Sequence, residues 1–312
     1  MNRILAAVCS SALALRALAA SEVLVSSRFT DNILRYNADT GAFLGVFASG
    51  PELDNPNGIA LGPDGNLYVG LGDAGAILRY HGQTGAFLDT FVPAGSNGLQ
   101  SVRDIVFGPD GDLYAASGAN DRVLRFDGVS GAFEGVAAIG DGLDGPVGLA
   151  FSPAGELFVA GALSNRVYAY RDGVFQRSFD AGATHSNAVG LAFNSAGRLL
   201  VSQSVTNEVL AFDPLSGAFQ GVFASGGLNI PIYMNMDDAG NLWVGSFGNN
   251  RVRKFDGLTG VSLGVAIAGG AGGLSGTHDI VFIPEPTTAI GVLAGGALWL
   301  LRRRNDAGAT SD

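Results

Sequence analysis

The chain has 312 residues, which is enough for one large domain or two ordinary ones, and 48 of them are glycine. Only 15% are charged, and the 47% that are hydrophobic fall in short runs, which favours an all-β fold. When five arginines and two aspartates near the two ends are left out, 13 of the 18 basic and 26 of the 28 acidic residues remain, a net charge of about −13. This charge repels phosphate backbones and argues against nucleic-acid binding.

Residues 1–19 have the pattern of a secretory signal peptide. The segment has a basic start, an apolar stretch and an Ala-Leu-Ala site at residues 17–19. Cys9, the only cysteine, lies within it, so the mature chain would contain neither disulfides nor thiol chemistry. The sequence therefore predicts export through the Sec translocon.

A repeat of about 44 residues follows. Each unit has four short apolar runs separated by turn residues, as in "GPDGNLYV" and its equivalents, which predicts four β-strands. The first turn of each unit contains a glycine suited to the positive φ of a hairpin. These glycines are Gly65, Gly111, Gly155, Gly197 and Gly240, spaced by 46, 44, 42 and 43 residues. Four strands per repeat with a drifting period indicate the blades of a β-propeller.

Two incomplete units flank five complete ones. The five run from about residue 51 to residue 270, residues 21–47 match only the last three strands, and "THDIVFIP" matches only the first. Together the fragments complete one more blade. We therefore expect a six-bladed propeller over residues 20–284, closed by pairing of the C-terminal strand with the N-terminal blade, which removes an open sheet edge.

The segments "SNRVYAY", "NDRVLRF" and "NNRVRKF" carry a family resemblance. They resemble the NHL-repeat propellers, whose pattern joins Asn and Arg to an aliphatic and an aromatic residue, and the resemblance extends over residues 21–284. It implies a propeller fold without specifying an activity, since such blades serve as enzymes and as binding platforms. Alternatively, these Asn and Arg residues serve only turns and surface ion pairs.

Polar residues gather at the entrances of the innermost strands of three adjacent blades. Propeller ligands usually meet these entrances at the central channel. The candidate ligand-binding residues are Asn57, Arg103, Asp104, His278 and Asp279. Four of them, Arg103, Asp104, His278 and Asp279, are also candidates for acid–base catalysis. The alternative is that Arg103 pairs with Asp104 and the aspartates only cap loops.

Two enzyme families resemble parts of this sector. "NPNGIALGPDG" is similar to the motif of gluconolactonase-type propellers, which implies Asn57 as a ligand of a divalent cation. The residues that follow the second strands of blades two to six are not acidic, which leaves Asp104 and Asp279 as the other candidate ligands, so the sequence predicts no cofactor and leaves a cation as an alternative. The virginiamycin B lyases, also propellers, imply His278 and His185 as metal-site candidates.

The segment 284–304 resembles a PEP-CTERM sorting signal. It consists of the motif Pro284-Glu285-Pro286, an apolar stretch at 287–301 and the basic stop Arg302-Arg303-Arg304, before a tail at 305–312. The fifteen apolar or small residues would span about 22 Å as a transmembrane helix, which the arginines can extend by snorkelling. The resemblance implies a transient anchor in the inner membrane of a Gram-negative bacterium and processing by an exosortase.

The sequence thus predicts an exported binding or scaffolding propeller at the cell surface or in the extracellular matrix. Polysaccharide or an envelope protein is the expected partner. The alternative is a propeller hydrolase or lyase that uses a metal at the central channel.

Overall fold

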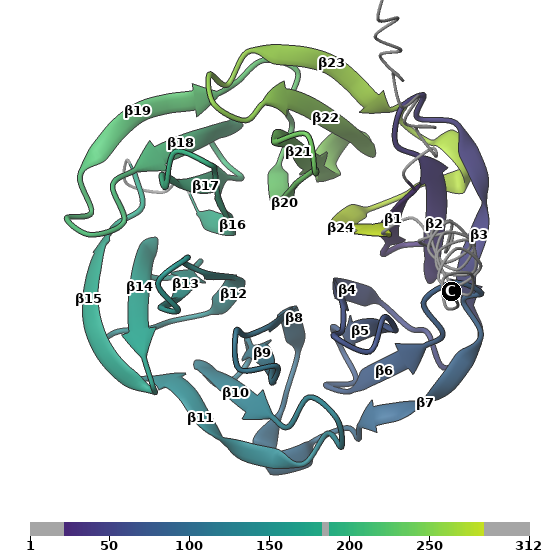
Figure 1. Ribbon diagram of the computed structural model, residues 1–312, viewed down its shortest axis with the longest axis horizontal. Helices are drawn as coiled ribbons and strands as arrows, with labels where there is room; N and C mark the ends of the chain where they lie inside the picture. The colour runs from purple at the N-terminus through teal and green to yellow at the C-terminus, as the bar shows by residue number, and fades with distance from the viewer. Residues whose placement is uncertain (1–21, 183–186, 284–312) are drawn as a thin grey trace, which may run out of the picture.

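The computed structural model describes residues 22–182 and 187–283. They form six four-stranded antiparallel sheets around a central axis, the predicted all-β six-bladed propeller (Figure 1). In this described part, helix is limited to three 3₁₀ turns, η1 (Ser96–Gly98), η2 (Phe247–Asn249) and η3 (Ala271–Gly273). No helix in these two ranges is long and apolar enough to cross a membrane. The expected signal peptide, His185 and the sorting signal lie outside the described residues.

The blades are numbered in ring order, each from its innermost to its outermost strand. Blade 1 consists of β24 (Thr277–Ile283), β1 (Glu22–Ser27), β2 (Asn32–Asn37) and β3 (Phe43–Ser49). Blade 2 consists of β4 (Pro56–Leu61), β5 (Leu67–Leu71), β6 (Ile77–Tyr80) and β7 (Phe87–Val92). Blade 3 consists of β8 (Val102–Phe107), β9 (Leu113–Ser117), β10 (Arg122–Phe126) and β11 (Phe133–Ile139).

The second half of the ring repeats this order. Blade 4 consists of β12 (Pro146–Phe151), β13 (Leu157–Gly161), β14 (Arg166–Arg171) and β15 (Val174–Asp180). Blade 5 consists of β16 (Ala188–Phe193), β17 (Leu199–Gln203), β18 (Glu208–Phe212) and β19 (Phe219–Ala224). Blade 6 consists of β20 (Pro231–Met236), β21 (Asn241–Ser246), β22 (Arg251–Asp256) and β23 (Ser262–Ile267).

Blade 1 joins strands from distant parts of the chain. β24 pairs antiparallel with β1, in a register that places Val25 opposite Ile280 and Val23 opposite Phe282. The Ser26 hydroxyl accepts a hydrogen bond from the Asp279 backbone N–H at 2.8 Å. β24 therefore has the innermost place in this blade that β4 has in blade 2.

The turn glycines adopt the conformation that the repeat predicts. The first-turn glycines Gly65, Gly111, Gly155, Gly197 and Gly240 have φ between 74° and 87°. A left-handed backbone of this kind costs glycine little, whereas a β-carbon would be strained there. The repeat's glycines therefore mark the hairpins directly.

The hydrophobic core consists of six clusters, each between two neighbouring blades. Between blades 1 and 2, for example, buried Leu24 and Ile33 pack with Ile59 and Val69. Between blades 6 and 1, Trp243 packs edge-on against Phe282, with ring centroids 5.3 Å apart. Each blade is thus buried only by its neighbours, and the ring must be complete for every face to be covered.

The Asn and Asp residues of the second turns join successive blades. Asp31 accepts a hydrogen bond from the Asn55 backbone N–H at 2.8 Å, and Asp121 accepts one from Gly145 at 2.9 Å. Asn207 and Asn250 do the same with the following blade, and all four residues have positive φ. These contacts favour the turn interpretation of the residues that resemble the NHL pattern.

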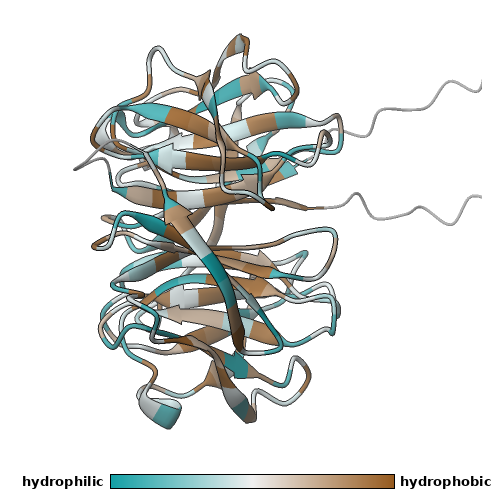
Figure 2. Ribbon diagram, turned by 90° about the vertical axis from the view of Figure 1, so that its left-hand side faces the viewer, coloured by the Kyte–Doolittle hydropathy of each residue, from teal (hydrophilic) through white to brown (hydrophobic). Residues whose placement is uncertain are grey.

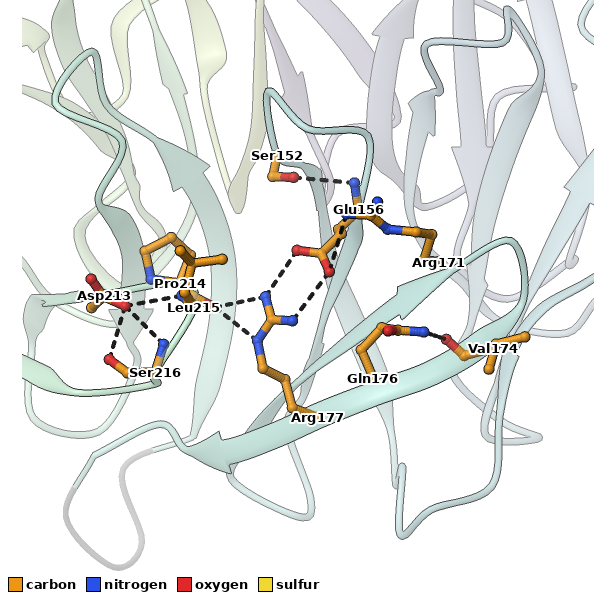
Figure 3. A network of polar contacts seen from close by, with 10 residues as sticks. All are labelled: Ser152, Glu156, Arg171, Val174, Gln176, Arg177, Asp213, Pro214, Leu215 and Ser216. Carbon is orange, nitrogen blue, oxygen red and sulfur yellow. Dashed lines mark hydrogen bonds and ion pairs between the residues drawn. The ribbon is translucent and has the colours of Figure 1, made fainter.

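An ion-pair network on the outer side joins blade 4 to blade 5 (Figure 3). Arg177 on β15 donates to both carboxylate oxygens of Glu156, at 3.1 and 2.9 Å, and also to the Pro214 carbonyl of blade 5. The Glu156 side chain is only 8% exposed and lies 3.5 Å from Arg171. Arg177 and Arg171 lower the pKa of Glu156, although burial opposes them.

The outermost strands carry apolar side chains toward solvent. Val46 on β3 and Val265 on β23 are 53% and 46% exposed. The side view shows hydrophobic and hydrophilic residues alternating in short bands along the strands (Figure 2). The pairing of each outermost strand also shifts register, as between β2 and β3, and such bulges interrupt a free edge and discourage edge-to-edge pairing.

Candidate functional site

The entrance of the channel is built by the second residue of each innermost strand. We call this ring the channel mouth: Asn57, Arg103, Val147, Val189, Ile232 and His278. The polar members belong to blades 1, 2 and 3, which are adjacent, and the aliphatic members to blades 4, 5 and 6. The mouth therefore has one polar and one apolar half. The predicted sector of five polar residues lies together in the polar half.

The two aspartates of this sector hold neighbouring blades together. Asp279 accepts hydrogen bonds from the backbone N–H of Ile59 at 2.8 Å and of Ile280 at 2.7 Å. Asp104 accepts them from Leu149 at 2.8 Å and Ile105 at 2.9 Å. Each carboxylate thus links its own inner strand to that of the next blade. Within the described residues no ion pair joins Arg103 to Asp104, so the alternative that these two residues pair is not borne out, whereas the aspartates do accept backbone hydrogen bonds.

Both carboxyl groups are buried, at 6% and 7% exposure, and this controls their protonation. Burial raises the pKa of Asp279 from 3.8 to about 7, although its two backbone N–H donors act in the opposite direction. Burial, and then repulsion from Asp279, raise the pKa of Asp104 well above its ordinary value. The two groups repel one another when both are ionised, so their protonation is coupled.

His278 is buried beside an aromatic ring. Its imidazole lies over the ring of Tyr233, with centroids 4.8 Å apart. Burial, followed by the charges of Arg28 and Arg103, lowers the pKa of His278 from 6.5 to about 3. The imidazole is therefore neutral at neutral pH. Its Nδ1 atom has no hydrogen-bond partner in the described structure, which is costly for a buried polar atom.

Tyr233 spans the channel. Its hydroxyl donates to the Arg103 carbonyl at 2.9 Å, from blade 6 to blade 3 on the opposite side of the ring. Its pKa is raised well above 10, chiefly by burial, so the phenol stays neutral. A cavity of about 560 Å³ follows the inner strands from Tyr233, and Asp104, Asp279 and Asn235 are among its polar lining.

Asn57 is fully buried and only partly satisfied. Its Nδ2 donates to the Val102 carbonyl at 2.9 Å, which fixes the orientation of the amide. Its Oδ1 has no hydrogen-bond partner in the described structure. The Asn57 carbonyl accepts a hydrogen bond from the Ser26 hydroxyl at 2.9 Å, so the backbone here is tied to blade 1.

Sequence reasoning missed one residue of the site, Arg28. It follows β1 directly and lies half-buried, with its Nε donating to Asn55 Oδ1 at 2.5 Å. The pKa of Arg28 is lowered by burial and then by the charge of Arg103, while Asp73 acts in the opposite direction. Alignment of the repeats could have identified this residue, because blade 1 carries a charged side chain at the position directly after its second strand. Blades 2 and 3 carry Gly72 and Gly118 at that position.

The arrangement does not fit a divalent cation. No group of three His, Cys, Asp or Glu side chains in residues 22–182 and 187–283 is placed to hold a metal. Each oxygen of Asp104 and Asp279 already accepts one backbone hydrogen bond, whereas the Asn57 amide oxygen accepts none. A hard cation needs several oxygen ligands, including some negative charge.

Comparisons with known proteins show the fold. Protein-family models and the curated proteins yield no match to the chain. Virginiamycin B lyase from Staphylococcus aureus superposes with a TM-score of 0.54 at 16% identity, covering 66% of this chain and 68% of that one. A chain of the nidogen/laminin complex superposes with a TM-score of 0.68 at 17% sequence identity, over 85% of this chain and 98% of that one. A candidate 6-phosphogluconolactonase from Bacteroides uniformis superposes with a TM-score of 0.58 at 18% sequence identity, over 85% of this chain and 99% of that one. At these identities the likeness extends to the architecture alone, and the chain takes its place among the six-bladed β-propellers.

Proposed function

We propose that the chain is an exported propeller that binds a ligand at the channel mouth and does not transform it. This proposal rests on the backbone hydrogen bonds that both candidate carboxylates accept. Asp104 and Asp279 each accept two backbone N–H groups and join adjacent blades. Each of the four oxygens accepts one backbone N–H, and this hydrogen bonding favours a role in holding the blades together over a role as catalytic base.

Metal analysis of the purified full chain tests this proposal. After dialysis against metal-free buffer we expect substoichiometric metal, both in the wild type and in Asp104→Asn and Asp279→Asn. One equivalent of divalent metal in the wild type, lost in either variant while the urea midpoint shows a folded protein, would contradict the binding proposal and favour a metal-dependent enzyme.

A hydrolase or lyase is the second candidate, and one observation favours it. His278 is neutral with a free Nδ1, and Asp279 titrates near neutrality, as an acid–base pair requires. The structural likeness to a virginiamycin B lyase and to a candidate lactonase suggests the substrates to test. Turnover of a streptogramin B or of a gluconolactone above the uncatalysed rate, abolished in His278→Gln, would establish this alternative.

The export part of the proposal rests on the sequence of the two ends. The signal pattern at 1–19 and the PEP-CTERM-like segment at 284–304 support passage through the Sec translocon, transient anchoring in the inner membrane and processing by an exosortase. Polysaccharide or an envelope protein at the cell surface or in the matrix is the proposed partner. We propose that the β24–β1 pairing closes the ring in the mature protein.

A further inference from the structure

The cavity inside the channel is distinct from the channel mouth. It has a volume of about 560 Å³, within the range of small-molecule sites, and none of the residues that form the mouth belongs to its described lining. It begins at the third residues of the inner strands, where Asp104, Tyr233 and Asp279 lie, and follows the strands to Phe107 and Phe282 near their ends. The cavity is therefore a second place at which a ligand can enter the ring.

The backbone N–H at the fourth place of each inner strand is directed toward this cavity. In blades 1 to 6 this place is held by Ile280, Ile59, Ile105, Leu149, Leu191 and Met234, in equivalent register with the second strand. Alternate residues of an antiparallel pair direct their N–H away from the partner strand. In blades 1 and 2 the N–H donates to Asp279, and in blades 3 and 4 to Asp104. Each carboxylate thus bridges the N–H groups of two adjacent blades.

Blades 5 and 6 lack the third carboxylate of this series. The third place of the inner strand is Asp279 in blade 1 and Asp104 in blade 3, but Gly190 in blade 5. In the part of the chain that the structure describes, no side chain accepts a hydrogen bond from the N–H of Leu191 or Met234. A β-carbon on Gly190 would lie 2.4 Å from a backbone carbonyl oxygen of blade 6, so a side chain of blade 5 does not fit there. An acceptor for these two N–H groups has to enter from the cavity.

A serine bridge gives the joint between blades 5 and 6 the geometry of the joint between blades 1 and 2. The Ser26 hydroxyl accepts a hydrogen bond from the Asp279 N–H at 2.8 Å and donates to the Asn57 carbonyl at 2.9 Å. The Ser202 hydroxyl accepts one from the Gly190 N–H at 2.8 Å and donates to the carbonyl of the second residue of β20 at 2.6 Å. Because the same atoms tie both joints, the free N–H pair of blades 5 and 6 is placed like the pair that holds the Asp279 carboxylate.

The rest of the lining selects the kind of ligand. On blades 5 and 6 the cavity is also lined by the apolar side chains of Ala192, Phe193 and Met236. The acidic members of the lining are the two channel aspartates and the exposed Asp238, and the described lining contains no Lys, Arg or His. A second negative charge on a ligand is therefore repelled, whereas an apolar body gains contacts.

A single carboxylate is tolerated because burial favours the neutral forms of the channel aspartates. Burial raises the pKa of Asp279 to about 7 and raises that of Asp104 well above its ordinary value. Burial likewise keeps the Tyr233 phenol neutral by raising its pKa. In mildly acidic solution little negative charge therefore opposes a ligand carboxylate at the free N–H pair, while the ligand itself stays ionised.

We propose that the channel cavity binds a small monocarboxylate, whose two oxygens accept the N–H groups of Leu191 and Met234 and whose apolar body lies against Phe193 and Met236. The chain itself shows this mode of binding, since a carboxylate bridges the equivalent N–H pair in the two joints that carry an aspartate. Hydrogen bonds from backbone N–H groups to a carboxylate are among the stronger ones. The inference goes beyond the proposed binding at the channel mouth and concerns a separate site.

Amide NMR of the purified full chain, labelled with heavy nitrogen at its methionines only, tests this inference. The chain has three methionines, and Met1 carries the terminal amine, so the amide signals are those of Met234 and Met236. Met236 is an internal control, because its N–H already donates to Asn235 Oδ1 at 2.8 Å. The signal that is lost in Met236→Leu assigns the pair.

Butyrate at about pH 6 should move the Met234 amide proton downfield in a saturable way, by at least about twice the change at Met236. Butyramide, the matched neutral analogue, and butylammonium should bind at least about tenfold more weakly. An unchanged Met234 signal at about 10 mM butyrate would overturn the site. Equal binding of butyramide would overturn the carboxylate assignment, and so would a preference for butylammonium, which would mean that the acidic lining dominates.

One variant assigns the joint. Ser202→Ala should weaken butyrate binding by about tenfold, because β16 and β20 lose the bridge that sets the spacing of the N–H pair. Ser246→Ala is the matched control, since Ser246 is equally buried on β21 but its hydroxyl contacts Asn229 in the loop before β20. Equal affinity in the two variants, with urea midpoints that show folded protein, would overturn the assignment to this joint. The metal and turnover results do not depend on this outcome, so a failure here leaves the proposed binding function to its own test.

Discussion

Replacing His278 by Gln and, separately, Asp279 by Asn should change the pH dependence of folding stability in opposite directions. The two residues are neighbours on β24 and both are buried, yet burial disfavours the positive charge of one and the negative charge of the other. In the fold both are neutral over a pH range in which both are charged in the unfolded chain. Each therefore changes the number of bound protons on folding, with opposite sign.

The sign follows from the two pKa shifts. The pKa of Asp279 is raised from 3.8 to about 7, so its contribution to stability is fully present below 3.8 and is lost as pH rises through 7. The pKa of His278 is lowered from 6.5 to about 3, so its contribution is present above 6.5 and is lost as pH falls through 3. At about 1.4 kcal/mol per pKa unit, each titration changes the free energy of unfolding by about 4 to 5 kcal/mol.

Between about pH 4 and 6.5 the two contributions oppose each other. The raised pKa of Asp104 adds a further fall with pH, so the wild type should lose stability gradually over this range. His278→Gln removes the opposing contribution of the histidine. The slope of its unfolding free energy against pH should therefore be more negative than that of the wild type, by up to about 1.4 kcal/mol per pH unit. Asp279→Asn should shift the slope by about the same amount in the positive direction.

Urea unfolding at about pH 4.5, 5.5 and 6.5 and constant ionic strength measures these slopes. Comparison of slopes rather than absolute stabilities cancels the packing cost of each substitution. Three parallel lines for the wild type and the two variants would refute the reasoning, because they would mean that neither group changes its protonation on folding.

Two further predictions concern the outer network and the sorting signal. Arg177→Ala should lower the free energy of unfolding by about 3 kcal/mol, because it leaves the buried Glu156 carboxylate without its bidentate partner. Arg166→Ala, which breaks an ion pair with the exposed Asp180, should cost less than about 1 kcal/mol in the same urea experiment, and equal losses would contradict the role of burial. Mass spectrometry of the native protein should find a C-terminus near Pro286, whereas an intact Asp312 in mature material would exclude processing.

The repeat allowed the fold to be predicted in detail. Gly65 and its equivalents mark the first hairpins of five blades, and the two incomplete units at the ends of the repeat predict the sixth. The polar sector was predictable for the same reason, since Arg103 and His278 occupy one aligned position. These features depend on local backbone geometry, which a repeated sequence pattern reflects directly.

The contacts within the sector were not predictable. A repeat alignment gives the position of Asp104 but not the direction of its carboxylate, which accepts the Leu149 N–H of the next blade and not an Arg103 proton. The phenol of Tyr233 reaches Arg103 on the opposite blade, a contact between residues 130 positions apart. Arg28 lies at the mouth because β1 pairs with β24, a relation that only the ring as a whole defines.

The place of β24 also has a consequence for the order of synthesis. Ser26 and Asp279, which hydrogen-bond in blade 1, are 253 residues apart. A growing chain can make blades 2 to 6 one after another, but β1 has no inner neighbour until residues 277–283 have been made. Contacts of such long sequence separation form slowly. The last step of folding is thus postponed until residues 277–283, at the end of the propeller, have left the ribosome.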